Sequence, residues 1–182
     1  MKSGTYVLIL SIGLLLQSCG GGTSNNPQTN TQQPAAKTSL EYMREGSAFY
    51  RRGDYQKAVE PYQKALDLEK AQPKLDKTMW RVLVDNLAMS YGISGNLPKA
   101  KETLEYGLSK DPDYPMFYYL MANTYAEMND EDNAIAYLKR AFERKENVIA
   151  GESIPDPATD DSFQRFMKSE KFLKALDEMK QK

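Results

Sequence analysis

The chain contains no histidine, one cysteine and one tryptophan in its 182 residues. Histidine is the commonest general base at neutral pH and the commonest metal ligand, so its absence removes the usual catalytic and metal-binding arrangements. A single cysteine, Cys19, cannot form a disulfide within the chain. There is also no phosphate-binding loop and no Gly-x-Ser-x-Gly elbow. The sequence therefore predicts a protein that is not an enzyme and has no cofactor and no metal site.

Catalysis by carboxylates alone is the enzymatic alternative that the composition leaves open. The candidates are Glu41 with Glu45, one helical turn apart, and Asp156, Asp160 and Asp161 in a predicted loop. The glutamates are also typical of an exposed helix face, and Thr159 or Asp160 would be an ordinary N-cap for the helices that follow. A carboxylate-dependent activity on cell-wall material is therefore a minor hypothesis.

Neither sign of charge is in excess, because 24 lysines and arginines face 25 aspartates and glutamates. A nucleic-acid-binding surface needs a strong positive field, which this balance does not supply. Arg140 and Arg144 lie one helical turn apart, as do Lys171 and Lys174, but acidic residues are interspersed among them. These pairs favour solvated helix faces, and no nucleic-acid partner is predicted.

A rhythm of small residues occurs three times in the chain. In each set the second small residue follows the first by 12 positions, and the third follows the second by 7. The sets are Gly46, Ala58 and Ala65; Ala88, Ala100 and Gly107; and Ala122, Ala134 and Ala141. Two antiparallel helices approach closely only where side chains are small, so each set indicates a helix pair. The second and third sets lie 34 residues apart, a period typical of helix-pair arrays.

Turn residues recur in phase with the small residues. Gly53, Gly95 and Asn129 stand at the matching place in each set, and all three tolerate a left-handed backbone. Bulky residues flank the small ones at fixed distances: Phe49, Tyr91 and Tyr125 on one side, and Tyr62, Leu104 and Leu138 on the other. The pattern predicts an all-α fold, an antiparallel helix-pair solenoid.

These residues, with Pro112 closing the second unit, resemble the tetratricopeptide repeat. The resemblance implies about three repeats, at 39–72, 81–114 and 115–148, which together form a repeat domain over 39–148. The step from Ala58 to Ala100 is eight residues longer than the next one, and the apolar residues from Met79 to Tyr91 predict a lengthened first helix in the second repeat. Trp80 is expected to pack beside this helix; the alternative is a binding anchor.

Residues 149–182 form a predicted C-terminal helical tail. Pro155 and Pro157 interrupt the pattern, after which apolar residues return at helical spacing: Phe163, Phe166, Met167, Phe172, Leu173, Leu176 and Met179. A repeat array leaves the apolar face of its last unit exposed and needs a cap. The tail is therefore predicted to be that cap, and the alternative is that its apolar stripe is a docking surface.

The first 18 residues are typical of an export signal. Lys2 precedes a largely apolar run over 6–16, which is too short to span a bilayer as a helix. Leu16-Gln17-Ser18-Cys19 resembles the bacterial lipobox, and the resemblance implies cleavage before Cys19 and its acylation, palmitoyl chains included. The alternative is an ordinary secretory signal with an incidental cysteine.

Residues 19–38 follow as a predicted flexible tether, since they lack large apolar residues and are rich in Gly, Asn, Gln, Thr and Pro. Gly20 is not the aspartate that retains familiar lipoproteins at the inner membrane. The expected location is therefore the cell envelope, lipid-anchored at the outer membrane and facing the periplasm.

In tetratricopeptide proteins the first helix of each repeat lines a concave groove. The resemblance places ten residues there: Met43, Ser47, Tyr50, Asp85, Asn86, Met89, Met116, Tyr119, Asn123 and Glu127. Methionine and tyrosine offer adaptable apolar contact, and asparagine can bond a peptide backbone. Only Asn86 matches the clamp with which some relatives hold chaperone tails, so that ligand is not predicted. The alternative is that three repeats are too few to form a groove and these residues are plain surface.

These features together predict an adaptor that binds an envelope protein or a peptide segment of one, held at the membrane by its lipid. The rival hypothesis is a fixed structural subunit of an outer-membrane or pilus assembly machine. The sequence does not predict an oligomeric state.

Overall fold

The computed structural model describes residues 36–181. The predicted signal peptide, Cys19 and nearly all of the tether lie outside the described residues. Over 36–181 the chain is helical, and no strand occurs in this range. The elements are α1 (Ser39–Tyr50), α2 (Tyr55–Ala71), α3 (Lys77–Ile93), α4 (Leu97–Lys110), α5 (Pro115–Glu127), α6 (Glu131–Phe142), η1 (Lys145–Asn147), η2 (Asp161–Phe166) and α7 (Glu170–Lys180).

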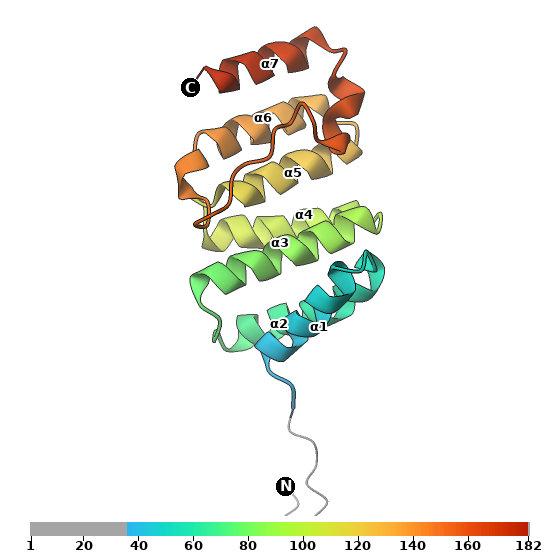
Figure 1. Ribbon diagram of the computed structural model, residues 1–182, viewed down its shortest axis with the longest axis vertical. Coiled ribbons are helices and arrows are strands. Elements are labelled where there is room, and N and C mark those ends of the chain that lie inside the picture. The colour runs from blue at the N-terminus through green and yellow to red at the C-terminus, as the bar shows by residue number, and fades with distance from the viewer. Residues whose placement is uncertain (1–35, 182) are drawn as a thin grey trace, which may run out of the picture. The chain divides into compact units, whose positions relative to one another are not determined.

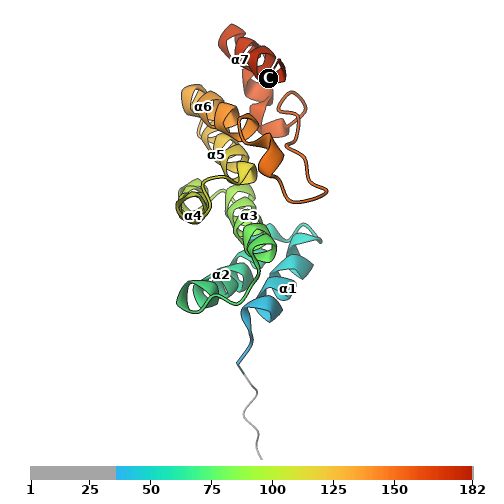
Figure 2. The same ribbon diagram turned by 90° about the vertical axis from the view of Figure 1, so that its left-hand side faces the viewer.

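The helices form antiparallel pairs that stack one after another (Figure 1). Helices that follow each other in sequence make the main contacts, from α1 with α2 to α6 with α7. Turned by 90°, α1, α3 and α5 each lie to one side of their partners α2, α4 and α6 (Figure 2). We call the side of α1, α3 and α5 the inner face. The predicted helix-pair solenoid is confirmed.

The turns within the helix pairs use the predicted residues. Gly53 and Gly95 have φ of 78° and 83°, and Asn129 has φ of 60°. An L side chain is strained in this region, and glycine and asparagine tolerate it best. Asn129 is the one non-glycine residue with positive φ in the described part of the chain. The chain can therefore reverse tightly enough for the two helices of a pair to stay in contact.

Small residues stand where the helices cross most closely. A Cβ atom built on Gly46 would lie 2.7 Å from the ring of Tyr62, and one on Gly107 would lie 3.0 Å from Phe117 and Val84. Ala58 and Ala100 are buried at comparable crossings. The rhythm of small residues is thus a packing requirement.

Helix α3 is lengthened, as its apolar spacing predicts. It has 17 residues, against 12 in α1 and 13 in α5. Asp76 fixes its start, because the side chain accepts a hydrogen bond of 2.8 Å from the Met79 backbone N–H. Trp80 in its first turn packs edge-on against Phe117, with ring centroids 5.7 Å apart, and against Tyr106. The tryptophan is therefore a packing residue between the second and third helix pairs.

The C-terminal tail caps the last helix pair. Its apolar side chains are buried together with those of α5 and α6: Phe163, Phe166, Phe172, Leu176 and Met179. Lys139 on α6 pairs with Glu178 on α7 at 2.8 Å, and Ser169 and Lys171 contact Glu131 and Asp132. The predicted cap is confirmed. Most of the apolar stripe is therefore unavailable for docking, and Leu173 is its exposed member.

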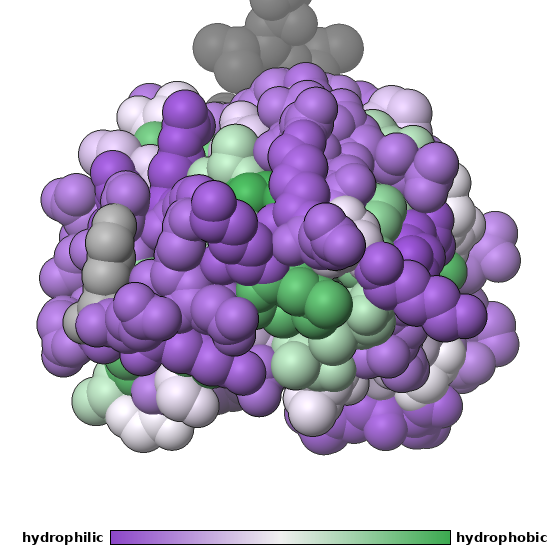
Figure 3. Space-filling view, turned by 90° about the horizontal axis from the view of Figure 1, so that it is seen from above, coloured by the Kyte–Doolittle hydropathy of each residue, from purple (hydrophilic) through white to green (hydrophobic). Residues whose placement is uncertain are grey.

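The outer side of this end is mostly hydrophilic, with a hydrophobic patch near its middle (Figure 3). Leu173 on α7 is one of the exposed large apolar residues, with 39% of its surface accessible. Among the described residues, no helix is long and apolar enough to cross a membrane.

Candidate protein-binding surface

The ten predicted groove residues lie on α1, α3 and α5, the three helices of the inner face (Figure 2). The structure engages most of them within the chain. Those on α1 pack against α2 and α3, Asp85 bonds Tyr114, and three residues on α5 bond the C-terminal tail, namely Tyr119, Asn123 and Glu127. Only part of the set remains open to a partner.

The residues from α1 are largely engaged in internal packing. Met43 is buried, and Ser47 Oγ donates to its backbone oxygen at 2.8 Å while accepting from the Tyr62 hydroxyl at 3.0 Å. The Tyr50 hydroxyl lies 3.3 Å from Met89 Sδ on α3, and burial raises the pKa of Tyr50 to about 12. These contacts join α1 to α2 and α3. Tyr50 and Met89, half-buried, keep part of their surface on the inner face.

Asp85 on α3 is buried and linked to the C-terminal segment. Tyr114, the N-cap of α5, places its hydroxyl 2.9 Å from Asp85 Oδ2 and 3.0 Å from Glu152 Oε2. The pKa of Asp85 is raised from 3.8 to about 8, chiefly by burial; the hydrogen bond from Tyr114 and the Arg81 charge oppose the rise, and the Glu152 charge adds to it. Asp85 is therefore mainly protonated at neutral pH.

Three predicted groove residues on α5 hold the chain's own tail. Tyr119 donates to Asp160 Oδ2 at 2.8 Å, and Asn123 Nδ2 donates to the same oxygen at 3.0 Å. Glu127 pairs with Arg165 at 2.7 Å. Burial, and then the bond to Asp160, raise the pKa of Tyr119. Figure 2 shows the segment before η2 running along the inner side of α5.

A cavity of about 610 Å³ remains beside this segment. It is lined by α3, the α3–α4 turn, α4, α5 and the start of η2: Ala88, Met89, Gly92, Ile93, Gly95, Leu97, Leu104, Leu120, Asn123, Thr124, Glu127, Asp160, Asp161 and Ser162. Three of the predicted residues line it, namely Met89, Asn123 and Glu127. The sequence analysis missed Ile93, which is 55% exposed. Its place four residues after Met89, on the same face of α3, was the available signal.

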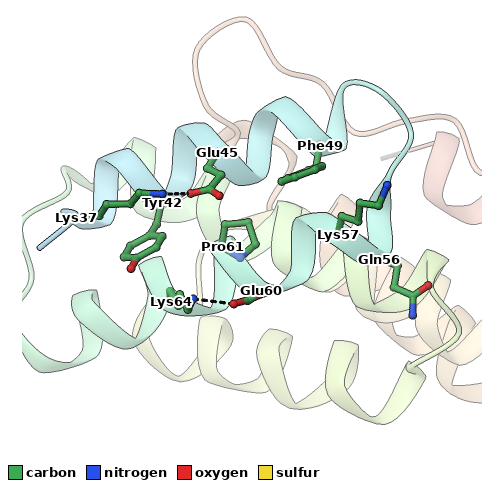
Figure 4. Close-up of a pocket in the computed structure, with 9 residues that line it drawn as sticks. All are labelled: Lys37, Tyr42, Glu45, Phe49, Gln56, Lys57, Glu60, Pro61 and Lys64. Atoms are coloured by element: carbon green, nitrogen blue, oxygen red, sulfur yellow. Dashed lines mark hydrogen bonds and ion pairs between the residues drawn. The ribbon is translucent and has the colours of Figure 1, made fainter. Parts of the chain in front are cut away.

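A second cavity, of about 640 Å³, lies between α1 and α2. Side chains of both helices converge on it, with Tyr42, Phe49 and Pro61 as its apolar part (Figure 4). Its charged rim is paired within the chain, since Lys37 bonds Glu45 and Lys64 bonds Glu60, each at 2.7 Å. No predicted site residue lines this cavity.

Four of the five carboxylates considered for catalysis have structural partners, and the fifth, Asp161, is exposed to solvent. Glu41 forms a capping box with Thr38 at the start of α1, and Glu45 pairs with Lys37. Asp156 accepts from the Ala158 backbone N–H at 3.0 Å, and Asp160 caps η2. Within residues 36–181 no group of histidine, cysteine or acidic side chains is arranged to hold a metal ion.

Stacked helix pairs with a cavity on their inner face define a helical-repeat protein, a class built around extended binding surfaces. Models of the tetratricopeptide repeat family match residues 42–75 and 117–148. The chain therefore contains tetratricopeptide repeats in these two stretches. The two matches overlap the first and third of the expected repeats.

Solved structures share the fold. The Sgt2 TPR domain from Aspergillus fumigatus is 22% identical, with a TM-score of 0.53 over 79% of this chain and 77% of that one. PcrH, solved in complex with the chaperone binding region of PopB, is 16% identical, with a TM-score of 0.51 over 78% of this chain and 93% of that one. A search of curated proteins finds no match.

Proposed function

We propose that the protein is an adaptor whose inner face binds a segment of another protein. The observation that carries this proposal is the cavity beside α3, where Met89, Ile93 and Leu97 give an apolar floor open to solvent. An exposed apolar surface in a hollow is typical of a protein-interaction site. The structure of PcrH, a protein of the same fold, was solved with a protein segment bound, which supports this class of partner.

We further propose that the adaptor acts in a bacterial cell envelope, lipid-anchored through Cys19 at the outer membrane and facing the periplasm. The support is the lipobox-like Leu16-Gln17-Ser18-Cys19 and the glycine at position 20. The substitution Cys19→Ala should abolish acylation and release the protein from membranes. Unchanged mass and membrane association of this variant would contradict the anchor and leave the adaptor role open.

The partner-binding role is tested by affinity capture and crosslinking in the native membrane. Ile93→Asn replaces the most exposed residue of the cavity floor with a polar side chain of similar size and should abolish capture of the partner. Leu68→Asn is the matched control, since Leu68 is 40% exposed on α2 and does not line the cavity. Tyr119 is unsuitable for this test because it is buried and holds Asp160.

The rival hypothesis, a fixed structural subunit of an outer-membrane or pilus assembly machine, predicts a different result. Most of the apolar stripe of the tail is buried, so such a subunit would have to use another surface, such as the cavity between α1 and α2. A partner that both Ile93→Asn and Leu68→Asn retain, and that Phe49→Ser loses, would favour this rival.

A further inference from the structure

The cavity beside α3 has walls of two chemical kinds. Its floor is apolar and comes from α3, α4 and α5, with Ile93 its most exposed large apolar side chain. Its other wall is acidic, with Glu127 at the end of α5 and Asp160 and Asp161 at the start of η2. No lysine or arginine is among the lining residues. The C-terminal segment thus forms one wall of the cavity and makes that wall negatively charged.

Only part of this acidic charge is neutralised within the chain. Arg165 pairs with Glu127 at 2.7 Å. Asp160 accepts hydrogen bonds from a hydroxyl, an amide and a backbone N–H, which stabilise its charge but do not cancel it. Asp161 is exposed to solvent. Two negative charges therefore remain at the edge of an apolar floor.

Resting on the adaptor function proposed above, we infer that the cavity accepts an apolar side chain of an extended partner segment that carries lysine or arginine at neighbouring positions. The apolar side chain would cover Met89, Ile93 and Leu97, and the basic groups would lie near Asp160 and Asp161. Long basic side chains suit this place, since their stems can cover apolar surface while the charged ends remain in water. A segment with acidic flanks would be repelled, so the cavity selects partners by charge as well as by shape.

Short synthetic peptides test this inference on the intact chain in detergent micelles. Three peptides share a central leucine and differ in its flanks, which are lysines, glutamates or serines. We expect the lysine-flanked peptide to bind about tenfold more tightly than the glutamate-flanked one at low ionic strength, with a smaller ratio at high salt. Asp161→Asn should reduce the ratio, whereas Asp177→Asn, at an exposed position on α7, should leave it unchanged. Ile93→Asn should weaken all binding.

The outcomes separate the inference from the function on which it rests. Equal binding of the three peptides, lost in Ile93→Asn, would overturn the charge preference and leave the adaptor function standing. Tighter binding of the glutamate-flanked peptide would also overturn the charge preference. So would an affinity ratio between the lysine- and glutamate-flanked peptides that Asp161→Asn leaves unchanged. Binding of none of the peptides would contradict both the inference and this cavity as the adaptor's site.

Discussion

The hydroxyl of Tyr119 on α5 donates a hydrogen bond of 2.8 Å to Asp160, 41 residues further along the chain. Asn123 donates to the same carboxylate oxygen, and Tyr114 reaches Glu152 in the same segment. These bonds hold the C-terminal segment on the face where the repeat pattern places a partner. The chain thereby occupies part of its own inner face and leaves the cavity beside α3 as the open part.

Removing the Tyr119 hydroxyl should loosen this segment. Tyr119→Phe keeps the ring, which packs edge-on against Phe163, and should lower the free energy of unfolding by about 1–2 kcal/mol. Hydrogen exchange should quicken over 158–162. Tyr137→Phe is the control, because no hydrogen bond of its hydroxyl occurs in the part of the chain that the structure describes. Equal effects of both variants would contradict the assigned role of the bond.

The buried Asp85 should make stability depend on pH. Its pKa rises from 3.8 to about 8 in the folded protein, so the folded state retains a proton that the unfolded state loses. The stabilisation is complete below about pH 4 and is lost as the pH rises towards 8. Asp85→Asn cannot ionise, so its free energy of unfolding should improve relative to the unmodified chain across this range. Urea unfolding at several pH values measures the difference, and a constant offset would contradict it.

The close crossing at Gly46 should not tolerate a methyl group. Gly46→Ala would place Cβ 2.7 Å from the Tyr62 ring and should destabilise the fold by about 1–3 kcal/mol. Gly92→Ala is the matched change, because its Cβ would meet only Ala100, at 3.9 Å. The free energy of unfolding of that variant should rise by up to about 1 kcal/mol, because alanine favours the helix more than glycine does. The melting temperatures of the two variants should shift in opposite directions. Shifts in the same direction would rule out this account of the small residues.

The cap should depend on the buried face of α7. Phe172→Ala removes a ring with no accessible surface and should cost about 3–5 kcal/mol. The neighbouring Leu173→Ala changes a side chain that is 39% exposed and should cost less than about 1 kcal/mol. Denaturant midpoints of the two variants give the comparison. Similar losses would mean that the tail does not act as a cap.

The regular part of the fold follows from local residue patterns. The turn glycines, Asn129 and the small crossing residues each satisfy a steric demand that recurs at a fixed place, so spacing alone predicts the helix pairs. The lengthened α3 follows from the same periodicity.

The pattern predicts the tail as a cap, but the bonds that hold the segment before η2 on α5 could not be predicted in this way. They are single long-range contacts, such as Tyr119 with Asp160, which no period marks. Because of these contacts, Tyr119 and Asn123, which the sequence predicts to bind a partner, hold the tail of the chain. Ile93 was missed because it is the last residue of α3, beyond the stretch to which the repeat pattern assigns groove positions.

The most direct test of the adaptor proposal is site-specific photocrosslinking in the native membrane. A photoreactive amino acid at position 93 would line the cavity, and one at position 68 would be exposed on α2, away from it. The account predicts a discrete crosslinked protein from position 93 and none from position 68. Crosslinking of the same protein from both positions, or from position 68 alone, would contradict partner binding at the inner face.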